Sequence, residues 1–157
     1  TPYPQRAIRT QDYALIMNFR PDRWPIGDPY RLREGPEPTV EELETNTRIT
    51  LADEDAGPTK AWLIKARKTD PWKKHFDKVY GKRPLIELFD LKSDPHEMHN
   101  LAGHQQYAAL EEELTKRLLD EMQRTGDPRL IGEGQFYETP PMAGPLKKKS
   151  PGWKNQK

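Results

Sequence analysis

The sequence predicts an α+β fold in which a small antiparallel sheet of three or four strands is packed by a long C-terminal helix. Two short runs near the start, 6–10 and 12–19, flank a tight polar turn, and a third β-rich run covers 85–91. Apolar residues recur at three-and-four spacing over 105–124. Alternation with a period of two indicates strands, whereas this wider spacing indicates an amphipathic helix. Extra short helices and an extended tail complete the predicted architecture.

The composition provides little material for a self-sufficient core. Of 157 residues, 33% are hydrophobic and 32% are charged, the net charge is +1 and the mean hydropathy is −1.04. One domain is expected at this length, and we expect it to depend on contacts with a partner for its stability. No apolar run approaches a membrane span, and a chain without cysteine forms no disulfide or thiolate metal site. Because the sequence starts at Thr1 with no initiator Met or signal peptide, we expect a piece of a longer protein.

The first two strands are expected to form a hairpin whose second strand is apolar on both faces. Tyr13, Leu15 and Met17 share one face of that strand, and Ala14 and Ile16 lie on the other. Successive side chains of a strand point to opposite sides of the sheet. Both faces of the sheet therefore need cover, and the long helix is expected to provide one cover.

The third strand begins a longer stretch, 87–102, that connects the sheet to the long helix. It reads Glu-Leu-Phe-Asp-Leu-Lys-Ser-Asp-Pro-His-Glu-Met-His-Asn-Leu-Ala. Asp94 suits an N-cap, Pro95 suits the first helical position, and Glu97 would complete a capping box. We therefore expect a helical turn to begin at this point.

The helix over 105–124 is the clearest in the sequence. Its apolar stripe must pack on the sheet, and Gly126 is placed to end the helix in a left-handed cap. Glu111 projects into the stripe and is expected to reach solvent or a cation. The stripe consists of Tyr107, Leu110, Leu114, Leu118 and Met122.

Residues 20–83 are predicted to be an insert of loops and short helices between the second and third strands. Thr39 and Glu42 form a capping box for one helix. A second helix is expected over 70–81, between a proline and a glycine, and Thr59 is expected to cap a shorter one before it.

Charge is unevenly distributed within this insert. Residues 34–55 hold eight acidic residues against one arginine, whereas 60–83 hold nine basic residues against Asp70 and Asp77. The two blocks are expected to face each other or to face separate partners. A basic stretch with interleaved aromatics can bind nucleic acid, but the net charge is small and no nucleic-acid module is recognisable, so we expect no such partner. An anionic polysaccharide would use the same charges.

The segment 20–30 contains three prolines and a glycine and must be irregular. Arg20 and Arg23 offer forked donors and Trp24 offers an aromatic face, which are groups that bind sulfated sugars. These three residues are the predicted substrate-binding residues. In the alternative interpretation, Trp24 fills an edge of the core. The arginines then pair with nearby carboxylates, namely Asp22, Asp28 or Glu34.

No metal site is expected in this chain. His96-Glu97-Met98-His99 resembles a zinc-protease motif, but that motif requires histidines four residues apart, and Asn100 occupies the required position. The remaining segment, 132–157, reads as an extended or disordered basic tail.

The third strand followed by Asp-Pro-x-Glu-x-x-Asn-Leu-Ala, residues 94–102, resembles the C-terminal subdomain of the type I sulfatases. The long helix ending in Thr-Gly-Asp-Pro at 125–128 adds to this resemblance. The run from Arg6 to Leu130 is most similar to the N-sulfoglucosamine sulfohydrolase (heparan sulfamidase) branch.

The resemblance implies a sulfatase C-terminal subdomain over 1–131, followed by the tail 132–157. Its partner would be the N-terminal catalytic domain, against which the sheet lies in that family. The parent enzyme would hydrolyse sulfate esters or N-sulfate groups of a sulfated glycan. A periplasmic, secreted or lysosomal location is also implied.

The resemblance also implies that catalysis lies outside this chain. Type I sulfatases convert Cys or Ser within Cys/Ser-x-Pro-x-Arg to formylglycine, which works beside a calcium ion. The run Ser93 to Glu97 matches only the first and third positions, and Glu97 replaces the required arginine. Formylglycine and calcium are therefore expected in the N-terminal domain, and this chain would complete the fold or wall the pocket. The alternative is a free-standing, non-catalytic module that binds an anionic polysaccharide or another polyanion.

Overall fold

The computed structural model describes residues 3–134 and residue 138, and its fold is α+β as predicted. One antiparallel sheet has the order β1-β2-β3, formed by Gln5–Arg9, Tyr13–Asn18 and Ile86–Asp90. Ile8 lies opposite Leu15, which in turn lies opposite Leu88. All three predicted strands are therefore present, and β2 is the central one.

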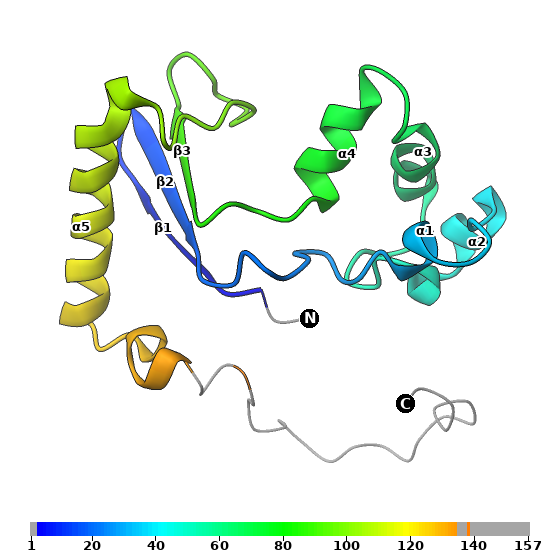
Figure 1. Ribbon diagram of the computed structural model, residues 1–157, viewed down its shortest axis with the longest axis horizontal. Helices are drawn as coiled ribbons and strands as arrows, with labels where there is room; N and C mark the ends of the chain where they lie inside the picture. The colour runs from blue at the N-terminus through cyan, green and yellow to red at the C-terminus, as the bar shows by residue number, and fades with distance from the viewer. Residues whose placement is uncertain (1–2, 135–137, 139–157) are drawn as a thin grey trace.

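The long helix packs on one face of this sheet, as its apolar stripe predicts. A 3₁₀ turn, η2 (Gln105–Tyr107), leads into α5 (Ala108–Arg124), which lies along the strands in Figure 1. The hydrophobic effect stabilises this packing because one continuous apolar layer leaves water. Its fully enclosed members are Leu15, Met17, Leu88, Leu114, Leu118 and Met122.

The opposite face of the sheet is partly covered by the chain itself. Ala14 and Phe89 on that face are 5% and 1% exposed. The ammonium group of Lys78 lies 4.4 Å from the centre of the Phe89 ring, a distance at which a cation is attracted to the ring. Lys78, which belongs to α4 (Trp72–Tyr80), therefore covers part of that face at Phe89.

The end of α5 is tied back to the first strand. Gly126 has a φ of +66°, as predicted, and the Asp127 amide donates to the Met122 carbonyl at 2.8 Å. The Asp127 carboxylate caps η3 (Pro128–Leu130) by accepting from the Arg129 amide, and it also accepts two hydrogen bonds from Arg6 at 2.5 and 3.0 Å. A second 3₁₀ turn, η4 (Gly132–Gly134), follows.

The Arg6–Asp127 pair should make stability depend on pH. The hydrogen bond from Arg6 holds the pKa of Asp127 below its usual value. The pair therefore contributes stability above the unfolded-state pKa, and this contribution is lost as the pH falls through the lower folded-state pKa. We expect the free energy of unfolding to fall less between about pH 5 and pH 2 in Arg6→Gln than in the wild type. Equal slopes in urea titrations across this range would contradict the assignment.

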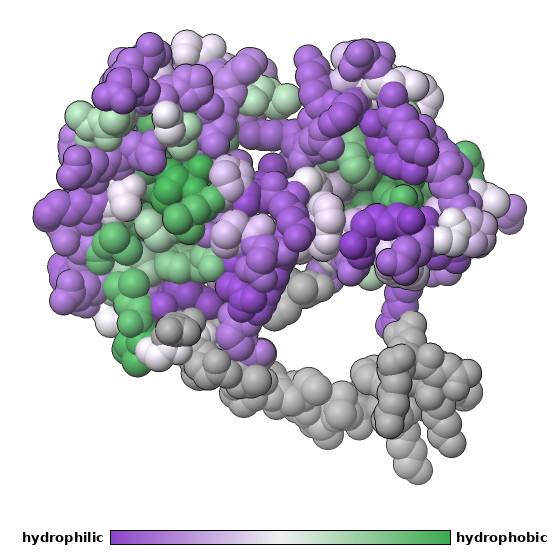
Figure 2. Space-filling model, in the orientation of Figure 1, coloured by the Kyte–Doolittle hydropathy of each residue, from purple (hydrophilic) through white to green (hydrophobic). Residues whose placement is uncertain are grey.

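Four short helices form a second group beside the sheet (Figure 1). They are α1 (Tyr30–Arg33), α2 (Val40–Thr45), α3 (Pro58–Ala66) and α4 (Trp72–Tyr80), with η1 (Thr47–Ile49) after α2. This group has its own hydrophobic core. On the face visible in Figure 2, apolar residues also gather over the sheet and α5. The fully enclosed members of the second core are Leu43, Ile49, Leu51, Ala61, Ile64 and Tyr80.

The starts of these helices agree only in part with the sequence prediction. Both hydrogen bonds of the Thr39–Glu42 capping box are present. Thr59 does not cap α3, because the helix begins one residue earlier at Pro58, after Gly57. A proline at the first helical position needs no amide partner, so it sets the start of the helix without a side-chain cap.

The acidic and basic blocks face each other, which is one of the two predicted arrangements. Glu37 forms an ion pair with Arg67, and the Tyr80 hydroxyl donates a hydrogen bond to the Glu54 carboxylate. Lys60 is 1% exposed, and its ammonium group donates to the carbonyls of Thr47, Leu51 and Glu54 at 3.2, 3.0 and 2.9 Å. Charges in this part of the insert thus hold the helices to their connecting loops.

The predicted capping box at 94–97 is wrong, because no helix begins there. The Asp94 carboxylate accepts from the His99 amide at 2.7 Å, and Glu97 pairs with Arg9 on β1. The Asn100 side chain accepts from the Leu88 amide at 2.8 Å and donates to the Ile86 carbonyl at 3.3 Å. Backbone groups at the edge of a sheet need partners, and satisfying the β3 edge outweighs local helix formation.

Glu111 also differs from its expected environment. Its carboxylate accepts from the Gly103 amide at 2.8 Å, so its partner is a backbone group rather than a cation. This hydrogen bond joins the first turn of α5 to the loop before it.

Candidate functional site

The predicted loop leaves β2 and is irregular until α1 begins at Tyr30. Arg20 donates to both carboxylate oxygens of Asp22 at 3.0 and 2.9 Å. This hydrogen bonding lowers the pKa of Asp22 to about 2. The guanidinium of Arg20 is thus held in a local pair, and pairing with Asp22 is the structural alternative that the sequence left open.

Arg23 lies beside a carboxylate from much further along the chain. It forms an ion pair with Glu138, which also accepts from Arg129 at 3.2 Å and lies 3.7 Å from Arg20. The hydrogen bond from Arg23 is the main reason that the pKa of Glu138 is lowered. Three guanidinium groups therefore gather around one carboxylate at this end of the sheet.

Trp24 connects the loop to the segment between α4 and β3. Its ring is half-buried, and the ammonium group of Lys82 lies 5.2 Å from the ring centre. Asp28, an alternative partner for the loop arginines, pairs instead with Arg33 at 2.8 Å. The loop thus brings its arginines near Glu138 and its tryptophan near Lys82.

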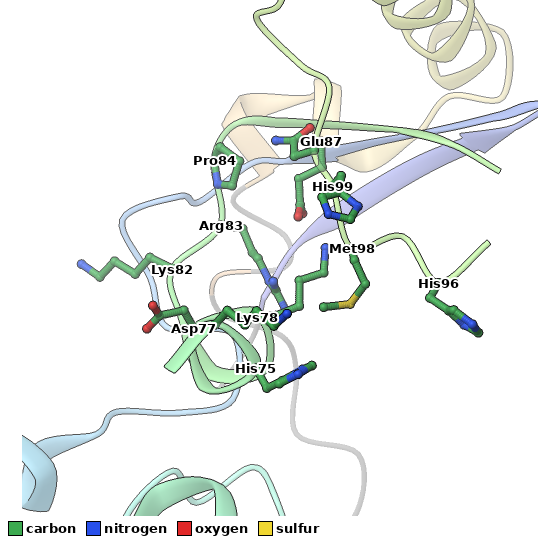
Figure 3. A pocket seen from close by; sticks show the side chains of 12 residues that line it. His75, Asp77, Lys78, Lys82, Arg83, Pro84, Glu87, His96, Met98 and His99 are labelled. Carbon is green, nitrogen blue, oxygen red and sulfur yellow. The ribbon is translucent and has the colours of Figure 1, made fainter. Parts of the chain in front are cut away.

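A cleft of about 760 Å³ lies between α4 and the loop that follows β3. In Figure 3 the Lys78 side chain reaches between Arg83 and Met98 toward Glu87 and His99, whereas Lys82 and His96 point away from the centre. The lining residues come from α4, the connection between α4 and β3, the start of β3 and the 96–100 segment. They are Lys74, His75, Asp77, Lys78, Lys82, Arg83, Pro84, Glu87, His96, Met98, His99 and Asn100.

The four basic side chains of the cleft have no carboxylate within ion-pair distance in the described part of the chain. These side chains belong to Lys74, Lys78, Lys82 and Arg83. Burial is the main cause that lowers the pKa of Lys78, and the nearby Arg83 lowers it further against the opposing effect of Glu87. A charge that is partly removed from water and lacks a close counter-ion favours the approach of an anion.

The two carboxylates that line the cleft have partners of their own. Asp77 pairs with Lys73 on the exposed side of α4. Glu87 is 7% exposed and accepts from the Asn18 side-chain amide at 3.0 Å. The cleft therefore has an excess of positive charge, and Glu87 is the carboxylate at its inner wall.

The sequence identified the basic block of the insert but did not predict this cleft. The signal was present, because Lys78 lies near the end of a helix and Lys82 and Arg83 lie in the connection to the strand that follows. The opposite wall could not be foreseen, since it consists of the 96–100 segment that was expected to be helical. Among the described residues no group of three or more His, Cys, Asp or Glu is placed to hold a metal ion.

Comparison with known proteins finds similarity to sulfatases over part of this chain. Residues 60–124 match the family described as N-sulphoglucosamine sulphohydrolase, C-terminal. An ulvan-active sulfatase of Formosa agariphila is 40% identical over 50 residues, which is 32% of this chain and 10% of that protein. An uncharacterized protein of Haemophilus influenzae is 34% identical over 56 residues, which is 36% of this chain and 29% of that protein.

These matches confirm the resemblance that the sequence predicted. The matched segment contains most of α3 and all of α4, β3 and α5, and so it contains the whole lining of the basic cleft. Arg20, Arg23 and Trp24 precede it. In the described residues, no helix has the length and apolar character needed to cross a bilayer.

Proposed function

We propose that this chain is the C-terminal part of a sulfatase-like hydrolase that acts on sulfate esters or N-sulfate groups of a sulfated glycan. The observation that carries the proposal is the family match over 60–124. The matched segment supplies one strand of the sheet and the long helix that packs on it. The ulvan-active sulfatase supports a polysaccharide substrate by similarity. In this proposal the chain completes the fold and forms part of the wall of the substrate pocket. The catalytic groups belong to another part of the enzyme.

The proposed partner is an N-terminal catalytic domain, which would hold the formylglycine and the calcium ion. This chain has no cysteine from which formylglycine could form, and Ser93 lacks the required arginine four residues later. The proposed C-terminal subdomain covers 1–131, with 20–83 as an insert. The tail 132–157 lies, apart from residues 132–134 and Glu138, outside the described residues.

The loop after β2 is proposed as the part of this chain that borders the substrate. Arg20 and Arg23 would bind sulfate or carboxylate groups, because a guanidinium donates two parallel hydrogen bonds to such anions. Trp24 would pack against a sugar ring. Glu138 supports this role, since its carboxylate lies beside Arg20 and Arg23.

The test is kinetic and uses the full-length enzyme that contains this chain. Arg23→Ala or Trp24→Ala should lower kcat/KM by about tenfold or more, a loss of ~1.4 kcal/mol in transition-state stabilisation. The melting temperature should stay near that of the wild type. Arg33→Ala, which removes an exposed paired arginine outside the loop, is the matched control. Alanine at Lys147 to Lys149 should also leave the kinetics unchanged.

Either of two results would remove the loop from the site. Unchanged kinetics in both loop variants would do so, as would a loss of activity that follows a loss of folded protein. Arg23 and Trp24 would then be structural residues that hold the loop to Glu138 and Lys82.

A free-standing module that binds a polyanion is the second candidate function. It is favoured by the cations of the cleft, which belong entirely to this chain and have no carboxylate within ion-pair distance among the described residues. The coding sequence upstream of Thr1 distinguishes the two. A Cys/Ser-x-Pro-x-Arg signature a few hundred codons earlier supports the hydrolase, whereas a start codon immediately upstream supports the module.

A further inference from the structure

We propose that the cleft between α4 and the 96–100 segment is an anion-binding site of its own, built around Lys78 and Arg83 and suited to the sulfate or carboxylate groups of an acidic polysaccharide. The site requires only this chain. That this anion is a sulfate or carboxylate group of the enzyme's own substrate rests on the proposed function. The loop residues discussed above are not part of this cleft.

The first argument is the contrast between these cations and others in the chain. Arg6, Arg9 and Arg67 each pair with a carboxylate, as does Lys116 on α5. In the cleft, by contrast, the described residues bring no carboxylate within ion-pair distance of Lys78 or Arg83. An unpaired pair of like charges at one site is unfavourable by itself, and a bound anion would remove this repulsion.

The second argument is the depth of the site. Lys78 is half-buried and lies over the Phe89 ring, so its ammonium group is held in place rather than extended into solvent. Fixed cations at a partly dehydrated wall bind an anion more strongly than mobile surface cations do. Lys74 and Lys82 at the rim would attract further anionic groups along the same polymer.

The third argument concerns the kind of polymer. Proteins that hold single-stranded nucleic acid usually supply aromatic rings on which the bases stack. Among the described residues, the cleft lining includes three histidines but no Phe, Tyr or Trp. The acidic groups of a polysaccharide can be held by cations at intervals, and a sugar has no base that must stack, so a polysaccharide fits this lining better than a nucleic acid does.

The experiment measures binding to the full 157-residue chain by isothermal titration. The probes are a dextran sulfate oligosaccharide, unsulfated dextran of the same length, inorganic sulfate and a single-stranded oligodeoxynucleotide. We expect dextran sulfate to bind and unsulfated dextran not to bind. Inorganic sulfate should compete with dextran sulfate, because both would occupy the same cations.

Three variants locate the binding site. Lys78→Gln combined with Arg83→Gln should weaken dextran sulfate binding by at least about tenfold. Lys116→Gln, on the outer face of α5, makes one charge change outside the cleft and should alter binding by less than about twofold. Glu87→Gln keeps an acceptor for Asn18 but removes a negative charge from the inner wall, so it should tighten binding by about threefold or more.

The double variant is expected to weaken binding and Glu87→Gln to strengthen it, and this difference distinguishes a lost binding site from a simple loss of fold. A misfolded variant does not gain affinity, so tighter binding by Glu87→Gln supports the site even if the double variant is unstable. Equal affinities in wild type, double variant and Glu87→Gln would overturn the proposal. Tighter binding of the oligodeoxynucleotide than of dextran sulfate would overturn the assignment to a polysaccharide.

The outcome is separable from that of the proposed function. Cleft-dependent binding by a chain whose parent shows no sulfatase activity would refute the hydrolase and retain the site. An active sulfatase whose chain binds dextran sulfate independently of Lys78, Arg83 and Glu87 would retain the hydrolase and refute the site.

Discussion

Leu114→Ala should lower the free energy of unfolding by about 2–5 kcal/mol. Leu114 is 1% exposed and lies in the layer between α5 and the sheet. Its truncation removes apolar contacts and leaves a cavity that rigid neighbours can fill only in part. Urea denaturation of the full chain, followed by circular dichroism, measures the change.

The control for this substitution is Lys116→Ala on the other side of the same helix. The Lys116 side chain is 75% exposed and pairs with Asp120 at 2.6 Å, so its loss should cost well under about 1 kcal/mol. The two substitutions make similar changes to helix propensity. Equal destabilisation would show that the wrong face of α5 had been assigned to the core.

The sequence predicts the sheet and the long helix well because periodicity reports local burial directly. Leu15, Leu88 and Leu114 each occupy positions where an alternating or helical pattern places apolar groups on one side. The pairing of β1 with β2 follows from the tight turn of the first hairpin. These features depend on neighbours in sequence or on a single packing face, so they can be inferred from one chain.

The 94–100 segment was predicted wrongly because its conformation depends on a distant strand. Asp94, Pro95 and Glu97 form a sound local signal for a helix start. The observed segment instead places Asn100 against the β3 edge and Glu97 beside Arg9. Long-range hydrogen bonds to an exposed strand edge override the local preference, and such partners are not visible in local patterns.

The candidate site was predictable only as a set of charges. Arg20 and Arg23 could be selected because their side chains and their Pro-rich loop are evident in the sequence. That Glu138 lies near Arg20, Arg23 and Arg129 could not be anticipated, since the residues are far apart along the chain. The basic cleft likewise needs the fold, because its two walls come from α4 and from the loop after β3.

Lys60→Met should destabilise the chain by about 2–4 kcal/mol, although it replaces a charged residue by an apolar one of similar length. The ammonium group of Lys60 donates to three backbone carbonyls of residues 47–54, which would lose these donors. Burial lowers the pKa of Lys60, so dehydration of the charge offsets part of the gain from these hydrogen bonds.

The matched control is Lys73→Met, because the Lys73 side chain is 64% exposed and pairs with Asp77 in the next turn of α4. Its substitution should change the free energy of unfolding by less than about 1 kcal/mol. Amide hydrogen exchange should also locate the effect of Lys60→Met, with faster exchange at the Ile49, Leu51 and Glu54 amides and little change in β2. If Lys60→Met were as stable as the wild type, the loop over 47–54 would be held by the Leu43, Leu51 and Ile64 core without the buried ammonium group. If instead exchange rose equally in β2, the two cores would unfold as one unit, and Lys60 would stabilise the whole chain rather than its own loop.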